Sequence, residues 1–290
     1  MTLPDGTYPS TCWECSTRCG SLVTLQGGKV ARVGPNKDHP GSKGAFCIKG
    51  IRALPELTYG EARIRHPMRR VGQRGSGNWD EISWDAALDE IADRLLLVRK
   101  EYGPESLVGA VSSAFFSRGA MVALLMRSLG SPNWMMNQDL CGGCRALSDK
   151  VTGLGIVGGE DVENTNCALI VGRNPSAADP VQWMGLRRAM EKGAKSIVID
   201  PAETPAAKSA DIWLRPRPGT DVAIALAMTQ VIIEEQLYDE SFVDTWTSGF
   251  DELKNRASDF PPTRAEELSG VPAADIVTSA RMYADGPSCF

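Results

Sequence analysis

Residues 12–19 read Cys12-Trp-Glu-Cys15-Ser-Thr-Arg-Cys19, and a fourth cysteine follows in Cys47-Ile-Lys-Gly50. Three thiols on one short loop can enclose one corner of a metal site, and a fourth can close it from a later turn. Thiolates are soft ligands that suit both zinc and iron-sulfur clusters. The spacing therefore predicts a zinc site or an iron-sulfur cluster, with unligated core cysteines as the third interpretation.

The composition is that of a folded, mildly acidic chain. Its 290 residues are 42% hydrophobic and 23% charged, which allows two or three domains with sizeable cores. A net charge of -5 argues against a general electrostatic grip on nucleic acid or anionic lipid. Residues 1–11 show no export signal, and no stretch approaches the roughly 20 apolar residues of a membrane helix. We expect a cytoplasmic protein without direct membrane insertion, whose eight cysteines serve metal ligation rather than disulfides.

Periodicity predicts an α/β fold. The first sixty residues are rich in Gly, Pro and Cys and contain short alternating stretches at 21–25 and 29–33, which indicates a small loop-and-strand module. Ser83 is expected to cap a helix that ends at Tyr102-Gly103-Pro104. We place domain boundaries at residues 63 and 145, which gives segments 1–63, 64–145 and 146–290.

The last segment alternates between apolar strands and helices. Strands are expected at 168–171, 196–199 and 212–214, and helices from about Val181 to Lys192 and from Asp221 towards Gln236. Strand-helix-strand order is typical of a Rossmann-like parallel sheet, which binds nucleotides where its strands end. Gly172 and Asp200 stand at such ends, and Asp221 is expected either to cap its helix or to bind guanine. Residues of these types are common in ordinary turns, so a structural role is the alternative.

Three stretches carry a family resemblance. The segment Cys47-Ile-Lys49-Gly50 after the C-x2-C-x3-C group, and residues 64–72 and 79–92 beyond it, resemble the bis-pterin molybdenum and tungsten oxidoreductases of the dimethyl sulfoxide reductase family. The resemblance implies a 4Fe-4S cluster on Cys12, Cys15, Cys19 and Cys47. It also implies that Lys49 lies between cluster and pterin and takes part in electron transfer, whereas the residue alone could be a surface lysine at a turn.

The same resemblance implies a protein ligand to the metal. Cys141 follows Gly130-Ser-Pro-Asn133 after seven residues, a placement similar to that in family members whose ligand to Mo or W is cysteine. A thiolate there would join four pterin dithiolene sulfurs. The alternatives are ligation by Cys144, a redox dithiol formed by the two cysteines, and half of a zinc site.

The segments that follow the strands resemble the family's domain for molybdopterin guanine dinucleotide. Relatives usually read Asp-Pro-Arg-Arg-Thr where this chain has Asp200-Pro-Ala-Glu-Thr204, so a phosphate contact by those arginines is missing. The resemblance implies that the cofactor contacts are Lys49, Gly172, Asn174, Asp200, Thr204, Gly219 and Asp221.

The leading hypothesis is therefore an oxidoreductase that acts on a small-molecule substrate. A non-redox hydratase of the acetylene hydratase type is the alternative, although Ser16 stands where that branch has an acidic residue. A truncated electron-transfer module without its own active site is another. Family catalytic subunits are much longer, so we expect the C-terminal pterin-binding domain to be absent and to come from the missing C-terminal part of the catalytic subunit. An iron-sulfur electron-transfer subunit is a further expected partner.

Overall fold

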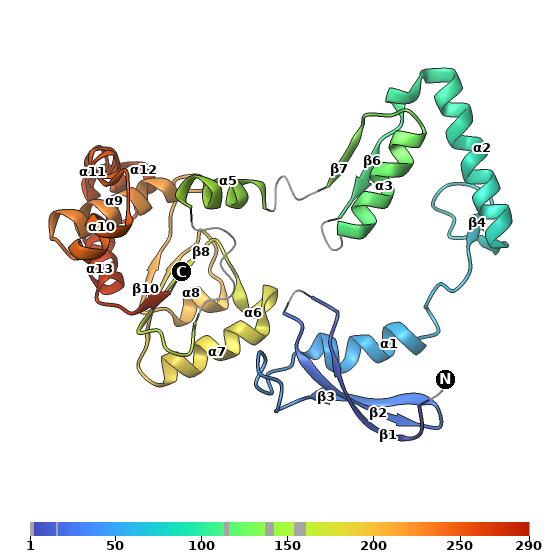
Figure 1. The fold of residues 1–290 in the computed structure, drawn as a ribbon, viewed down its shortest axis with the longest axis horizontal. Coiled ribbons are helices and arrows are strands. Elements are labelled where there is room, and N and C mark those ends of the chain that lie inside the picture. The colour runs from blue at the N-terminus through green and yellow to red at the C-terminus, as the bar shows by residue number, and fades with distance from the viewer. Residues whose placement is uncertain (1–2, 16, 113–115, 137–141, 154–160, 290) are drawn as a thin grey trace. The chain divides into compact units, whose positions relative to one another are not determined.

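The computed structural model describes residues 3–15, 17–112, 116–136, 142–153 and 161–289 (Figure 1). Two residues singled out above, Ser16 and Cys141, lie outside this part. The chain divides into two compact units. Residues 1–60 and 159–290 form the first, and residues 61–158 form the second. The α/β fold with its cysteine-rich segment and parallel sheet agrees with the sequence expectation, while the predicted boundaries at 63 and 145 stay a prediction.

The first unit begins with a three-stranded antiparallel sheet in the order β1-β2-β3. The strands predicted from alternation at 21–25 and 29–33 are confirmed as β2 and β3. Pro9 obscures the signal of β1, and proline is tolerated there because β1 lies at the sheet edge. The strands are β1 (Gly6–Thr11), β2 (Gly20–Gln26) and β3 (Lys29–Pro35). A π-helical turn and a short helix follow: η1 (Lys49–Ala53) and α1 (Leu54–Tyr59).

A four-stranded parallel sheet forms the centre of the remainder of this unit, in the order β10-β9-β8-β11. Successive residues of β8 face opposite sides of the sheet, since Cys167 packs in one core and Ala168 in the other. In the central strand, Ile197 and Val198 are fully buried, as expected of a sheet covered on both faces. The strands are β8 (Cys167–Val171), β9 (Lys195–Ile199), β10 (Ile212–Leu214) and β11 (Ser288–Cys289).

Helices cover both faces of this sheet (Figure 1). One face packs on α9, α12 and α13, and the other on α7 and α8. The predicted helices near 181–192 and from Asp221 are confirmed, and the second ends at Glu234, two residues before the expected Gln236. The helices are α6 (Pro175–Ala178), α7 (Pro180–Glu191), α8 (Pro205–Ser209), α9 (Asp221–Glu234), α10 (Glu240–Trp246), α11 (Phe250–Ser258), α12 (Pro262–Ser269) and α13 (Ala273–Ala284).

The second unit contains a hairpin, a long helix and a two-stranded parallel pair. Ser83 caps the long helix as predicted, since its hydroxyl accepts a hydrogen bond from the Ala86 amide at 3.1 Å. Leu95 and Val98 pack against the buried core of this unit, whereas Trp84 is 65% exposed. The elements are β4 (Met68–Arg70), β5 (Trp79–Glu81), α2 (Trp84–Tyr102), η2 (Pro104–Ser106), β6 (Gly109–Val111), α3 (Phe116–Ser128), β7 (Trp134–Met136) and α5 (Gly143–Thr152).

The loop after α3 positions the chain that leads towards Cys141. Ser131 donates a hydrogen bond to the Leu107 carbonyl at 2.6 Å, and the Gly109 amide donates to the Asn133 carbonyl at 2.9 Å. These bonds place β7 beside β6. Across the described ranges, no helix is both long and apolar enough to cross a membrane.

Candidate cluster and dinucleotide site

The first three cysteines lie on the loop between β1 and β2. Cys12 directly follows β1 and Cys19 directly precedes β2, and the Cys12 amide donates to the Cys19 carbonyl at 2.8 Å. This bond closes the loop, so Cys15 lies at its exposed tip while Cys12 and Cys19 are buried. Cys47 is half-buried and lies two residues before the start of η1. Three thiols from a tight hairpin loop thus meet a fourth from a helical turn.

The four thiols lie within electrostatic reach of one another. Burial raises the pKa of the Cys12 thiol, an amide hydrogen bond at Glu14 offsets part of the rise, and Cys15 and Cys47 raise the pKa further. Burial also raises the pKa of Cys19 to about 11, with added contributions from Cys15, Cys12 and Cys47. Thiolates so grouped repel each other unless cations neutralise them, as iron does in a cluster held by four cysteines. The donor set therefore fits an iron-sulfur cluster.

Within the part of the chain that the structure describes, no three His, Cys, Asp or Glu side chains converge on a point that one metal ion could occupy. A 4Fe-4S cluster makes a different demand, because each thiolate binds its own iron. The grouping of the four thiols is compatible with that arrangement.

The turn at residues 36–45 supports the cluster loop at Gly20. The Gly20 amide donates to the Ser42 hydroxyl at 3.1 Å, and the Ser42 amide donates to Nδ1 of His39 at 3.1 Å. A Cβ atom on Gly20 would lie 2.2 Å from the Cβ of His39. Only glycine therefore fits here, and His39 has a structural role in the turn.

Lys49 stands at the first position of η1, two residues after Cys47. Its side chain is exposed and makes no hydrogen bond or ion pair with another described residue. The neighbouring Gly50 is buried, and a Cβ there would lie 2.5 Å from the Phe46 ring. The backbone next to the fourth cysteine is thus held by packing, while the lysine ammonium stays available. Its place between cluster and pterin stays a prediction.

Arg18 is a residue of this loop that sequence reasoning missed. Its guanidinium lies 4.0 Å from the centroid of the Trp13 ring, a cation–π contact. Its Nη1 atom is buried and has no hydrogen-bond partner in the described part of the chain. A cation within the C-x2-C-x3-C loop suits an anionic group, and the position of Arg18 directly before Cys19 is the signal in the sequence that could have drawn attention to it.

The candidate cofactor residues gather at the carboxyl ends of the parallel strands. Strand order runs from β8 through β9 to β10 on one side and reverses to β11 on the other, so the switch point lies beside β8. Gly172, just past β8, has φ +57°, and a Cβ there would meet nothing within 4 Å. Asn174 begins α6 as its N-cap residue, and its Oδ1 accepts from the Ser176 hydroxyl at 2.7 Å. This loop offers open backbone next to an amide side chain.

Asp200 and Thr204 shape the turn after β9. Oδ1 of Asp200 accepts from the Ala202 amide at 2.8 Å, and the Thr204 hydroxyl accepts from the Ala207 amide at 3.1 Å. Both residues are buried, with 7% and 9% of their surfaces exposed. Both therefore have a local structural role, which for Asp200 was the alternative considered above, and a cofactor contact stays a prediction for both residues.

Gly219 and Asp221 lie at the start of α9. Gly219 has φ +85°, which glycine adopts without strain. The N-cap residue is Thr220 rather than Asp221, so the capping role considered for Asp221 is wrong. The Asp221 side chain instead lines a cavity of about 310 Å³ together with Val171 and Ile199. This places a carboxylate beside the ends of β8 and β9.

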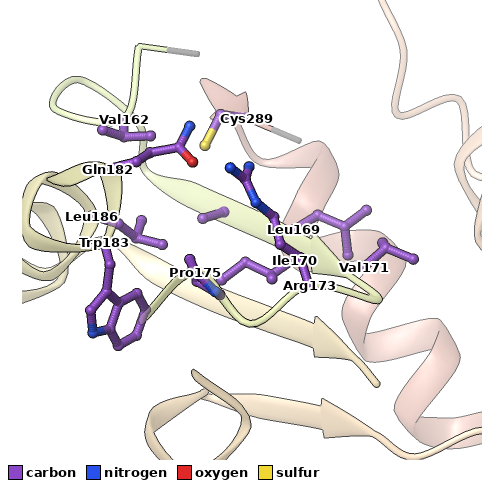
Figure 2. A pocket seen from close by; sticks show the side chains of 11 residues that line it. Val162, Leu169, Ile170, Val171, Arg173, Pro175, Gln182, Trp183, Leu186 and Cys289 are labelled. Atoms are coloured by element: carbon purple, nitrogen blue, oxygen red, sulfur yellow. The ribbon is translucent and has the colours of Figure 1, made fainter. Parts of the chain in front are cut away.

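A second cavity, of about 170 Å³, lies along β8 on the α7 face (Figure 2). Arg173 and Gln182 supply its polar side chains, among apolar neighbours that include Trp183 and Leu186. Cys289 of β11 also contributes. Both cavities border the switch point, where doubly wound sheets bind nucleotides. Arg173 supplies a cation at this site, and sequence reasoning did not identify it.

Two family models match the sequence. The molybdopterin oxidoreductase Fe4S4 domain matches residues 5–59, and molybdopterin oxidoreductase matches residues 63–280. Acetylene hydratase from Syntrophotalea acetylenica is 38% identical over 280 residues, which cover 94% of this chain and 38% of that protein. The thiosulfate reductase molybdopterin-containing subunit PhsA from Salmonella typhimurium is 35% identical, with coverage of 95% and 36%.

Two further relatives match a similar share of this chain. The F420-dependent formate dehydrogenase 1 subunit alpha from Methanococcus maripaludis is 35% identical, covering 94% of this chain and 40% of that protein. The solved structure of acetylene hydratase from Pelobacter acetylenicus is similar with a TM-score of 0.74 and 35% identity, covering 97% of this chain and 39% of the other. The chain thus spans about two fifths of the length of these relatives.

Proposed function

The chain belongs to the molybdopterin oxidoreductase family and includes that family's Fe4S4 domain, and on this premise we propose that it holds a 4Fe-4S cluster and contributes to a Mo- or W-dependent redox enzyme for a small substrate. The observation that carries the proposal is the grouping of four cysteine thiols, in which Cys15 and Cys47 lie close enough to Cys12 and Cys19 to add to the rise in pKa that burial gives these two. The chain spans two fifths of the length of its relatives, so the catalytic activity is proposed for an enzyme of their full length.

The chain's own residues have separate tasks in this proposal. Cys12, Cys15, Cys19 and Cys47 hold the cluster. When bound, the Mo or W centre supplies an open coordination position and a change of oxidation state, which no side chain provides. The exposed ammonium of Lys49 follows the fourth cysteine closely and stabilises the negative charge of a reduced cluster.

The sheet edge supplies contacts for one molybdopterin guanine dinucleotide. The backbone of Gly172 admits a phosphate, and Arg173 in the adjoining cavity compensates its charge. The carboxylate of Asp221 can accept hydrogen bonds from guanine or ribose at the other cavity. Asn174, Asp200, Thr204 and Gly219 surround these positions as further proposed contacts.

We assign the protein ligand of the metal to Cys141, which lies outside the described residues. Cys144, within the described part, is exposed near the start of α5 and is the competing ligand. A Cys141→Ser variant that keeps its iron but loses bound Mo or W, beside a Cys144→Ser variant that keeps both, would support this assignment. The reverse pattern would move the ligand to Cys144.

A non-redox hydratase is the second candidate function. Its support is the 38% identity to acetylene hydratase from Syntrophotalea acetylenica. A redox enzyme requires an electron donor or acceptor, whereas a hydratase uses its metal as a Lewis acid and turns over without one. Assays of the metal-loaded protein with and without an artificial electron acceptor separate the two. An electron-transfer module without an active site would show neither activity and would contain iron alone.

The first test concerns the cluster. We expect protein purified without oxygen to contain about four irons, with broad visible absorption. Cys47→Ser should lose most of the iron because it removes one of four ligands. The control is Cys289→Ser, which changes a half-buried cysteine in β11 and should leave iron content unchanged. One zinc per chain and no visible absorption in the parent protein would contradict the proposal.

The proposed partners follow from the same reasoning. Electrons that enter or leave the cluster require a carrier, and an iron-sulfur electron-transfer subunit has the matching chemistry. A second pterin dinucleotide is proposed to bind outside these residues, since the chain spans about two fifths of the length of its relatives. Co-purification of the complete enzyme with an iron-containing subunit would support the first of these partners.

A further inference from the structure

Asp179 joins the cluster loop to the dinucleotide-binding part of the same unit. Its Oδ1 accepts a hydrogen bond from the Thr17 hydroxyl at 3.4 Å and another from the Gln182 amide at 3.2 Å, which caps α7. Its Oδ2 lies 3.6 Å from the Arg173 guanidinium. Thr17 belongs to the C-x2-C-x3-C loop, and Arg173 lines the cavity beside β8. One carboxylate thus touches both candidate cofactor sites.

We propose that Asp179 is a positioning residue that lowers the reduction potential of the cluster by accepting the Thr17 hydroxyl proton, which the Cys15 sulfur would otherwise accept. This inference rests on the proposed cluster. The potential of an iron-sulfur cluster rises with hydrogen bonds to its sulfurs and falls with nearby negative charge. Asp179 affects both quantities.

The hydroxyl of Thr17 has one proton and two neighbours that can accept it. The Cys15 sulfur lies 3.4 Å from Thr17 Oγ1, the same distance that separates this oxygen from Asp179 Oδ1. Once Cys15 is a thiolate on iron it has no proton to donate, and it competes with the carboxylate for the hydroxyl proton. The carboxylate takes the proton and leaves the sulfur without this hydrogen bond.

Packing keeps Asp179 in place. Val181, two residues along, packs against the core that contains Cys12 and Cys19. The Asp179 side chain is only 22% exposed, so its charge acts through a partly water-excluded region. Asp179 is also the N-cap residue of α7. Its hydrogen bond from the Gln182 backbone amide fixes the direction in which the carboxylate points.

The central test compares Asp179→Asn with Asp239→Asn. Asp239 caps α10 in the same way, its Oδ1 accepting from the Phe242 amide at 2.8 Å, and among the described residues it makes no hydrogen bond or ion pair with the cluster loop. Asparagine keeps an oxygen for the cap in both variants, but it removes the charge and accepts the Thr17 proton more weakly than a carboxylate does, so that the iron-bound Cys15 sulfur can take this proton. The midpoint potential of the cluster, followed by electron paramagnetic resonance, should rise in Asp179→Asn and stay unchanged in Asp239→Asn.

Iron and sulfide content distinguishes a failure of the proposed cluster from a failure of the proposed role of Asp179. A parent protein without iron would overturn the proposed cluster. Full iron content in all variants with an unshifted potential in Asp179→Asn would overturn the role of Asp179 alone. Equal shifts in both asparagine variants would also overturn it, since they would reflect a general charge effect.

The Thr17→Val change in two backgrounds tests whether Asp179 acts on the potential through the Thr17 hydroxyl. Thr17→Val in the parent should change the potential little, because the hydroxyl donates to Asp179. The same change in an Asp179→Ala background should lower the potential from its raised value, because the hydroxyl freed by alanine then donates to Cys15. A Thr17→Val variant whose potential falls equally in both backgrounds would show that Thr17 already donates to Cys15, which contradicts the proposal.

Discussion

At the scale of single residues, the absence of a side chain at Gly20 determines how the cluster loop is supported. The Gly20 amide bonds to Ser42, and the imidazole of His39 fills the space that a side chain would take. Gly34 in β3 offers a contrast. A Cβ on it would meet only Nε of Arg32, at 3.9 Å. Two glycines of one small sheet therefore carry opposite steric constraints.

We predict that Gly20→Ala destabilises the cluster segment and reduces its iron content. The new methyl group must displace His39, and overpacking of this kind costs about 1–3 kcal/mol. Gly34→Ala should change the midpoint of thermal unfolding little and leave the iron content intact. Iron analysis and thermal unfolding of both variants provide the check. Equal iron content in the two variants would show that the turn at 36–45 yields without cost.

At the scale of elements, the starts of β9 and β10 are joined by one carboxylate. Oδ2 of Asp211 accepts from the Ser196 amide at 2.8 Å, and its Oδ1 pairs with Lys195 at 3.0 Å. Burial alone raises the pKa of Asp211, but the hydrogen bonds from Lys195 and Ser196 outweigh it and lower the pKa below its ordinary value. The folded state therefore favours the carboxylate over its protonated form.

The sign of the pH dependence follows. A pKa lowered by folding adds stability that is present above the unfolded value of about 4 and is lost as pH falls through the folded value. Asp211→Asn should cost about 1 kcal/mol near neutral pH, and its difference from the parent should vanish in acid. The control Glu203→Gln removes an exposed partner of Lys208 and should cost less than about 0.5 kcal/mol. Denaturant unfolding at several pH values measures both, and a difference for Asp211→Asn that persists in acid would contradict the assignment.

Elements with strong periodicity could be predicted from the sequence. Very short strands, and contacts between residues far apart in the sequence, could not. The pattern around Ser83 and the apolar run before Gly172 gave correct elements because their signals are local. The strands β6 and β7 have three residues each, too few for a period to be recognised. At the site, the four cysteines were recognisable from spacing. The contact between Thr17 and Asp179 spans 162 residues, and no local pattern encodes it.

At the scale of the whole molecule, an ion-pair group links the beginning of the chain to its later part. Glu163 accepts from Lys43 at 2.6 Å and from Arg188 at 3.3 Å. The hydrogen bond from Lys43 is the largest cause that lowers the pKa of Glu163, and Arg188 lowers it further. The link connects residues 1–60 with residues 159–290, which together form the first unit.

We predict that Lys43→Glu weakens this link by about 0.5 kcal/mol, because the pair is largely exposed and screened by salt. Adding Glu163→Lys should restore part of the lost stability, because residues 43 and 163 again carry opposite charges. The recovery is incomplete because the new lysine repels Arg188. A double-mutant cycle on thermal unfolding, repeated at high salt, measures the coupling. Strict additivity of the two changes at low salt would show that the pair contributes no coupling.

The discontinuous first unit has a consequence for the order of events during synthesis. The cysteine loop emerges from the ribosome early, yet Val181 and Arg188, which complete its packing and its ion-pair group, emerge only after residues 61–158. At the usual rates of translation this interval lasts on the order of ten seconds. Throughout it Cys12 and Cys19 lack part of the packing that later buries them. The chain order thus leaves the cysteine loop more open to solvent during this interval than in the folded unit.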